Sequence, residues 1–75
     1  MKIGIPKEIH TDEKRVATTP DVARQLIKLG FEVTVESGAG SGSHFSDSAY
    51  TEAGVTVVGS AKSIWQDSDI ILKVR

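Results

Sequence analysis

Four short apolar runs alternate with longer polar segments along the chain. The runs cover residues 1–5, 31–35, 55–58 and 70–74, and each has the length of a strand rather than a helix. The last run is continuously apolar over residues 70–72, as expected of a strand buried on both faces of a parallel sheet. The pattern therefore predicts four strands joined by the polar segments.

Helix signals stand in the first long connection. Thr19 can cap free N–H groups, Pro20 suits the first helical position, and Asp21 favours the positive end of the helix dipole. Apolar residues at helical spacing follow, and Gly30 is a natural C-terminal stop. The predicted apolar face consists of Val22, Ala23, Leu26, Ile27 and Leu29.

Two shorter helices are predicted further along the chain. Ser46 and Asp47 open the first, and the second covers residues 60–66. The whole pattern is then β-α-β-α-β-α-β, which predicts an α/β fold with a parallel sheet and right-handed crossovers. There are no internal repeats and no long linker, so residues 1–75 are expected to form a single unit of a domain.

Composition excludes several classes of protein. The chain of 75 residues is 39% hydrophobic and 25% charged with a net charge of −1, which is typical of soluble proteins and gives no electrostatic case for nucleic-acid binding. It contains no cysteine, so disulfides and thiolate metal sites are excluded. No apolar run approaches the roughly 20 residues that span a bilayer, and we expect a soluble segment without membrane insertion.

The glycine-rich stretch of residues 38–43 follows a predicted strand and invites a dinucleotide-binding interpretation. That fingerprint needs a third glycine or alanine where this chain has Ser43, and the next helix begins only near Ser46. The following strand also ends in Gly59 rather than in the required acid. The stretch is therefore expected to be a tight connection in which glycines accept positive φ, with no cofactor-binding residue in this chain.

Four basic residues stand out, of which one follows the first predicted strand, one precedes the first helix and two end the fourth strand. They are Lys7, Arg15, Lys73 and Arg75. If those strands are neighbours, all four lie at one carboxyl edge of the sheet, where α/β folds bind ligands. Such a cluster suits an anionic ligand, because guanidinium groups bind carboxylate or phosphate in a bidentate manner. The spacing alone favours the alternative, a solvated rim in which the cations pair with Glu8, Asp12 or Glu13.

The remaining polar residues show no catalytic pattern. His10 and His44 have no neighbouring Cys, His or acid at ligand spacing and are expected to be exposed, so no metal site is predicted. Trp65 shares its short helix with Ile64 and is expected to be a core anchor. No pairing of a nucleophile with a base is visible, and the acids are expected to lie in loops and turns, namely Asp12, Glu13, Asp67 and Asp69.

Five blocks of sequence together resemble the N-terminal domain of the alanine dehydrogenase / pyridine nucleotide transhydrogenase family. The resemblance covers the whole chain in order and without gaps, and it implies an incomplete Rossmann-like or flavodoxin-like N-terminal subdomain. The five blocks are IGIPKE (residues 3–8), RVATTP (15–20), VESGAG (35–40), AG (53–54) and ILKV (71–74).

Within the family, the chain is more similar to the branch of α subunits of proton-translocating NAD(P) transhydrogenases. The stretches QLIKLGFEV (residues 25–33) and IWQ (residues 64–66) resemble that branch. Alanine dehydrogenases usually end the fourth strand with Lys-Val-Lys and use the second lysine and an earlier arginine to bind substrate. Those positions correspond to Arg75 and Arg15 here, so the lysine is replaced while its charge is kept.

The resemblance implies a role within a larger enzyme. The full protein would transfer hydride from NADH to NADP⁺ with proton translocation, using NAD(H) and NADP(H). A second, Rossmann subdomain beyond Arg75 would carry the Gly-rich fingerprint and bind NAD(H) in the cleft between the two subdomains, so the fragment alone is expected to be inactive. The implied partners are the rest of the polypeptide, a β subunit and a second copy in a homodimer, and the implied location of the complex is the cytoplasmic face of the inner membrane.

Two alternatives stay open. The chain could be the corresponding part of an NAD-dependent alanine dehydrogenase, as Arg15 and Lys73 suggest. It could also be a stand-alone small α/β binding module, although a small parallel sheet leaves two edges and one face uncovered. For the same reason, the isolated chain is expected to be marginally stable and to associate with itself through apolar surface.

Overall fold

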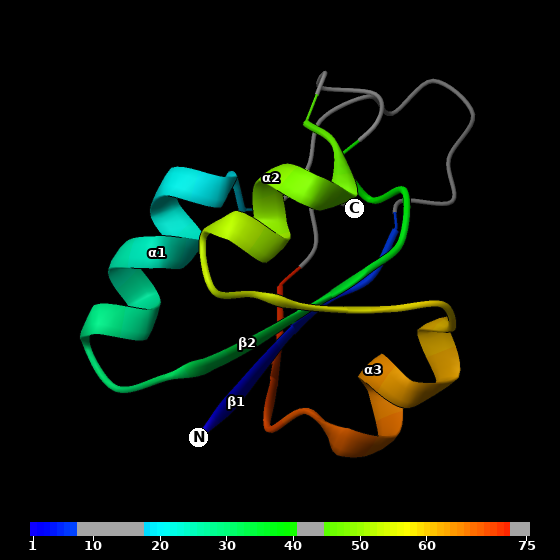
Figure 1. Ribbon diagram of the computed structural model, residues 1–75. Coiled ribbons are helices and arrows are strands. Elements are labelled where there is room, and N and C mark those ends of the chain that lie inside the picture. Colours follow the sequence, from blue (N-terminus) through cyan, green and yellow to red (C-terminus); the bar gives the residue numbers. More distant parts are fainter. Residues whose placement is uncertain (8–17, 41–44, 73–75) are drawn as a thin grey trace.

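A four-stranded parallel sheet forms the centre of the molecule (Figure 1). The computed structural model describes residues 1–7, 18–40 and 45–72. The strand order is β3-β2-β1-β4 and every neighbouring pair is parallel, which confirms the predicted α/β class. The strands are β1 (Lys2–Ile5), β2 (Glu32–Glu36), β3 (Thr56–Val58) and β4 (Ile70–Ile71).

Three helices connect the strands in the predicted order, namely α1 (Pro20–Lys28), α2 (Asp47–Glu52) and α3 (Ala61–Asp67). Each begins after a hydroxyl residue that accepts a hydrogen bond from the first turn: Thr19 before α1, Ser46 before α2 and Ser60 before α3. The helices α1 and α2 cover one face of the sheet and α3 covers the other (Figure 1). This follows from the strand order, because right-handed crossovers in opposite directions place their helices on opposite faces.

The main core lies between the sheet and the pair α1 and α2. Alternate strand residues point into it, and β1 and β2 contribute equally because their register places Ile3 beside Val33 and Ile5 beside Val35. Tyr50 of α2 is the largest side chain that is fully buried there. The other buried apolar residues of this core are Ala23, Ala39, Ala53 and Val55.

The opposite face is filled mainly by one residue, Ile64 of α3, which is fully buried. It packs where β1 carries Gly4, whose lack of a side chain allows the close approach. A Cβ added at Gly4 would lie 2.7 Å from Ile64 Cγ2 and would overlap Ser68 Oγ. Gly4 therefore sets the distance between α3 and the sheet.

Two predictions about packing are wrong. Trp65 is 55% exposed rather than a core anchor. Successive helical residues point about 100° apart, so only one of Ile64 and Trp65 can face the sheet, and Ile64 does. On α1, Val22 and Leu29 are exposed because they lie at the margins of a narrower buried stripe centred on Ala23.

The strand boundaries differ slightly from the sequence pattern. The second strand starts and ends one residue later than predicted, so Glu36 belongs to β2 rather than to the following turn. The predicted fourth strand continued to Val74, but residues 73–75 lie outside the described residues, where β4 ends at Ile71. None of the described helices has the length and apolar run that crossing a membrane requires.

Candidate anion-binding edge of the sheet

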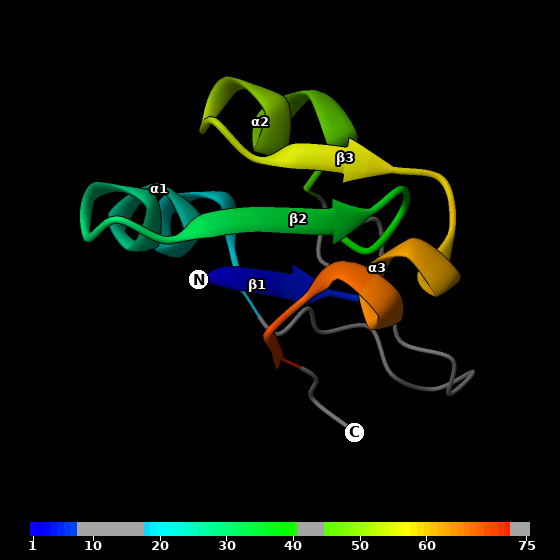
Figure 2. The same cartoon turned by 90° about the horizontal axis from the view of Figure 1, so that it is seen from below.

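The structure makes β1 and β4 neighbours, which was the condition for the predicted cluster of cations. Ile3 pairs with Ile70 and Gly4 with Ile71, and Leu72 N–H donates to the Gly4 carbonyl at 3.0 Å. The two strands therefore run side by side to the same carboxyl edge. The neighbouring strands β1, β2 and β3 point the same way in Figure 2. Of the four predicted cations, Lys7 is placed at this edge. The other three, Arg15, Lys73 and Arg75, lie outside the described residues, as do His10 and His44.

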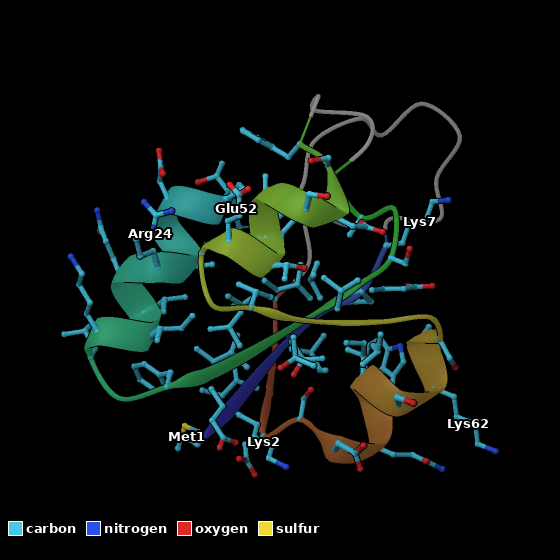
Figure 3. The ribbon with its side chains drawn as sticks, viewed as in Figure 1. Met1, Lys2, Lys7, Arg24, Glu52 and Lys62 are labelled. Carbon is cyan, nitrogen blue, oxygen red and sulfur yellow. The ribbon has the colours of Figure 1, made fainter. Side chains whose placement is uncertain are left out.

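Lys7 is held at the end of β1 through its backbone. Pro6 is buried, and Lys7 carries the first N–H group after the strand. That N–H donates to Glu36 Oε1 at 2.7 Å, which ties the end of β1 to the last residue of β2. The Lys7 side chain is exposed and lies beside the turn that follows β2 (Figure 3).

The turn after β2 is fixed by Asp47, the first residue of α2. Ser37 Oγ donates to Asp47 Oδ2 at 2.6 Å, and Gly38 N–H donates to Asp47 Oδ1 at 2.9 Å. These bonds, the one from Gly38 first, lower the pKa of the Asp47 carboxyl. Gly38 has a φ of +83°, as predicted for a tight connection, and a Cβ there would lie 3.7 Å from Lys7 Nζ.

The second glycine of this turn has a packing role. A Cβ at Gly40 would lie 2.7 Å from Tyr50 Cε2 and 2.8 Å from Phe45 Cβ, so the backbone passes directly against the Tyr50 ring. Tyr50 O–H in turn donates to the carbonyl of Thr18 at 2.8 Å, in a buried position next to the start of α1. Burial raises the pKa of Tyr50 to about 12. One tyrosine thus joins α2, the glycine turn and the chain before α1.

The described residues do not fit a dinucleotide. For a glycine turn after β2, the acid that holds the ribose hydroxyl belongs at the end of β3, where this chain has Gly59. The glycine turn does not lead directly into a helix, and the Gly38 N–H that a phosphate would need is already donated to the Asp47 carboxylate at the start of α2. Among the described residues there is also no group of three potential metal ligands. Of the predicted cations, this edge carries Lys7 among the described residues, and its role in binding an anion stays a prediction.

A groove of about 420 Å³ lies elsewhere, along the face covered by α3. Its polar lining comes from the sheet and from α3, and Lys7 does not contribute to it. It is therefore separate from the carboxyl edge. Ile27, Phe31, Val33, Gly54 and Val58 also line it, and its polar lining residues are Lys2, Glu32, Thr34, Thr56, Ser63, Asp67 and Ser68.

Sequence reasoning missed three residues that organise the edge, Glu36, Asp47 and Tyr50. The second predicted strand ends before Glu36, and Asp47 is predicted only as part of a helix start. The signal for Tyr50 was available, because a tyrosine with a buried ring usually finds a partner for its hydroxyl. No signal in the sequence indicated that the partner would be the Thr18 carbonyl, 32 residues away.

The fold and this edge define a parallel-sheet, Rossmann-like α/β unit with a cation at the ligand-binding side of the sheet. Residues 4–75 match the family described as "Alanine dehydrogenase/PNT, N-terminal domain". The chain belongs to this family, which confirms the resemblance found in the sequence.

Its relatives include two kinds of oxidoreductase. The chain is 53% identical over 75 residues to the NAD(P) transhydrogenase subunit alpha of Cereibacter sphaeroides, and the alignment covers 100% of this chain and 14% of that protein. It is 47% identical over 75 residues, again its whole length, to 20% of the alanine dehydrogenase of Bacillus subtilis (strain 168). A solved L-alanine dehydrogenase structure superposes with a TM-score of 0.93 at 42% identity, over 97% of this chain and 20% of that one. The chain thus spans 14% to 20% of these relatives.

Proposed function

We propose that this chain is the first part of the NAD(H)-handling component of a proton-translocating NAD(P) transhydrogenase. The observation that carries the proposal is the 53% identity to a transhydrogenase subunit alpha along the whole chain. Arg75, where alanine dehydrogenases usually have lysine, supports the same choice. The full protein transfers hydride from NADH to NADP⁺, with NAD(H) bound by residues outside this chain.

Within that enzyme, the chain contributes an anion-binding edge. Lys7 is positioned at the carboxyl end of β1, and the neighbouring strand β4 leads to Lys73 and Arg75 in the sequence. Arg15 belongs to the connection that begins at Lys7. Three cations from adjacent strand ends, together with Arg15 of the connection, suit a carboxylate or a phosphate. The fragment alone has no hydride-transfer activity.

The proposed complex contains a β subunit and two copies of the NAD(H)-handling component, located at the cytoplasmic face of the inner membrane. The test is an assay of membranes that carry the full-length protein and its partner subunit. We expect hydride transfer from NADH to an NADP⁺ analogue with a distinct reduced absorbance. Absence of this transfer, together with alanine-dependent formation of NADH, would overturn the proposal.

The second candidate is an alanine dehydrogenase, favoured by the 47% identity to the Bacillus subtilis enzyme and by Arg15 and Lys73. In that case Arg15 and the cation at position 75 hold the substrate carboxylate. The full-length protein would then form pyruvate from alanine and NAD⁺ without any partner subunit. Robust pyruvate formation would establish this candidate in place of the first.

A further inference from the structure

We propose that Glu36 is a positioning residue for Lys7, an inference that rests on the proposed anion-binding edge. Glu36 does not touch the anion. Its carboxylate accepts the Lys7 N–H at 2.7 Å and so fixes the point where the chain leaves β1. A hydrogen bond to an ionised acceptor is about twice as strong as a neutral one, which suits this anchoring role.

The other side of Lys7 is bounded by the turn after β2. A Cβ built at Gly38 would lie 3.7 to 3.9 Å from the Lys7 Nζ, Cδ and Cε atoms, so the Lys7 side chain passes beside Gly38 on the open side of the turn. Asp47 holds the same turn through the Gly38 N–H and the Ser37 hydroxyl. The backbone of Lys7 is thus held by Glu36, and its side chain lies beside a turn that Asp47 holds.

The charge of Glu36 and its anchoring of Lys7 are expected to change the affinity for an anion in opposite directions, and this difference makes the inference testable. A negative charge near Lys7 opposes the binding of an anion, at about 1 kcal/mol for unit charges 4 Å apart in water. Electrostatics alone therefore predicts that removing Glu36 strengthens anion binding. Positioning predicts the opposite, because without the anchor the Lys7 ammonium is no longer held at the edge.

Three variants of the full-length protein separate these effects. Glu36→Gln removes the charge but keeps an oxygen that can accept the Lys7 N–H. Glu36→Ala removes both the charge and the anchor. Glu52→Ala is the matched control, because Glu52 is an exposed acid on α2, away from Lys7 (Figure 3). The comparison of the Gln and Ala variants isolates the anchor at equal charge.

The measurement is calorimetric titration of the full-length protein with pyruvate as the carboxylate probe and, separately, with NADH as the phosphate probe. The probe that represents the ligand of this edge is the one that Lys7→Met binds more weakly than the wild type does. We expect Lys7→Met to lower the affinity for that probe about five- to tenfold. For that probe, Glu36→Gln binds as tightly as the wild type or more tightly. Glu36→Ala binds about three- to tenfold more weakly than Glu36→Gln, and Glu52→Ala is unchanged.

The double variant Lys7→Met with Glu36→Ala completes the cycle and binds no more weakly than Lys7→Met alone, because Glu36 acts through Lys7. If Lys7→Met weakens binding while Glu36→Ala is as tight as Glu36→Gln, the positioning role is refuted and the anion site stands. If Lys7→Met changes the affinity for neither probe, Lys7 is not part of an anion site, and both the proposed edge and this inference are overturned.

Discussion

Replacing Tyr50 with phenylalanine tests how this small domain is held together around its candidate site. The substitution removes only the hydroxyl and leaves the buried ring packed against Gly40. The lost hydrogen bond is the one to the Thr18 carbonyl at 2.8 Å. Thr18 is 2% exposed, so water cannot easily replace the missing donor. The change therefore probes one buried bond between α2 and the start of α1.

The expected cost follows from that burial. Leaving a buried acceptor without its partner costs about 1–3 kcal/mol, whereas an exposed hydrogen bond contributes about half as much or less. We expect Tyr50→Phe to lower the free energy of unfolding by about 1–2 kcal/mol, from a total of roughly 5 kcal/mol for a domain at the low end of the usual range. The control is Thr51→Ala, which removes an exposed bond from Thr51 Oγ1 to the Asp47 carbonyl and should cost under about 0.5 kcal/mol.

The pH dependence gives a second, independent signature. The pKa of Tyr50 is raised from 10.0 to about 12, so its contribution is fully present below pH 10 and is lost as the pH rises towards 12. The phenylalanine variant lacks this loss, so the stability advantage of the wild type shrinks as the pH rises above 10.

The assay is urea unfolding of the 75-residue chain and both variants, followed by circular dichroism between pH 7 and 12. The difference between wild type and Tyr50→Phe isolates the phenol, because the two chains differ in no other ionisable group. Tyr50 is the only tyrosine, and its ionisation can also be followed by tyrosinate absorbance. A pH-independent difference, or ionisation of Tyr50 at its ordinary pKa in the folded chain, would refute the burial of the phenol, and equal stabilities at pH 7 would refute the hydrogen bond.

Three further predictions concern the packing on the α3 face and the glycine turn. Gly4→Ala should destabilise the fold by about 1–3 kcal/mol, because its Cβ would lie 2.7 Å from Ile64 Cγ2. Gly59→Ala is the control, because a Cβ there meets no atom within 4 Å. The midpoints of urea unfolding compare the two variants, and equal midpoints would contradict the packing of α3 on Gly4. Ile64→Ala should cost about 2–5 kcal/mol, and Trp65→Gln under about 1 kcal/mol, since only Ile64 is buried; the reverse order would contradict the orientation of α3. Because the pKa of the Asp47 carboxyl is lowered, its stabilising contribution is present above pH 3.8 and is lost as the pH falls through the pKa of the folded state. Thermal melts recorded at decreasing pH should therefore show a smaller loss of stability for Asp47→Asn than for the wild type. Identical curves would contradict the hydrogen bonds from Asp47 to the turn.

The order of elements could be predicted from the sequence because each signal is local. Thr19 before α1 and the glycine turn after β2 have short-range meanings that tertiary contacts did not override. The neighbouring position of β1 and β4 could be stated only as a condition, since strand order depends on long-range packing. Trp65 was misassigned for a related reason, because the sequence does not specify which of two adjacent apolar residues faces the sheet.

The candidate site was less accessible to prediction than the fold. Its cations could be selected by charge and by their position at strand ends. The residues that hold Lys7 in place could not, because a hydrogen bond between Glu36 and a backbone N–H 29 residues earlier leaves no pattern in the sequence. Charge identifies which residues could bind a ligand, while their positioning depends on contacts that form only in the folded chain.

The central claim is that the carboxyl ends of β1 and β4 form an anion-binding edge. The most direct test compares the affinity of the full-length protein for pyruvate and NADH with that of single variants in which each proposed cation is replaced by methionine. The control is Lys62→Met, an exposed lysine on α3 (Figure 3). We expect each replacement at the edge to weaken the same ligand about fivefold or more, with Lys62→Met unchanged. If the edge variants bind both ligands as tightly as Lys62→Met does, the claim is wrong. The four edge positions are Lys7, Arg15, Lys73 and Arg75.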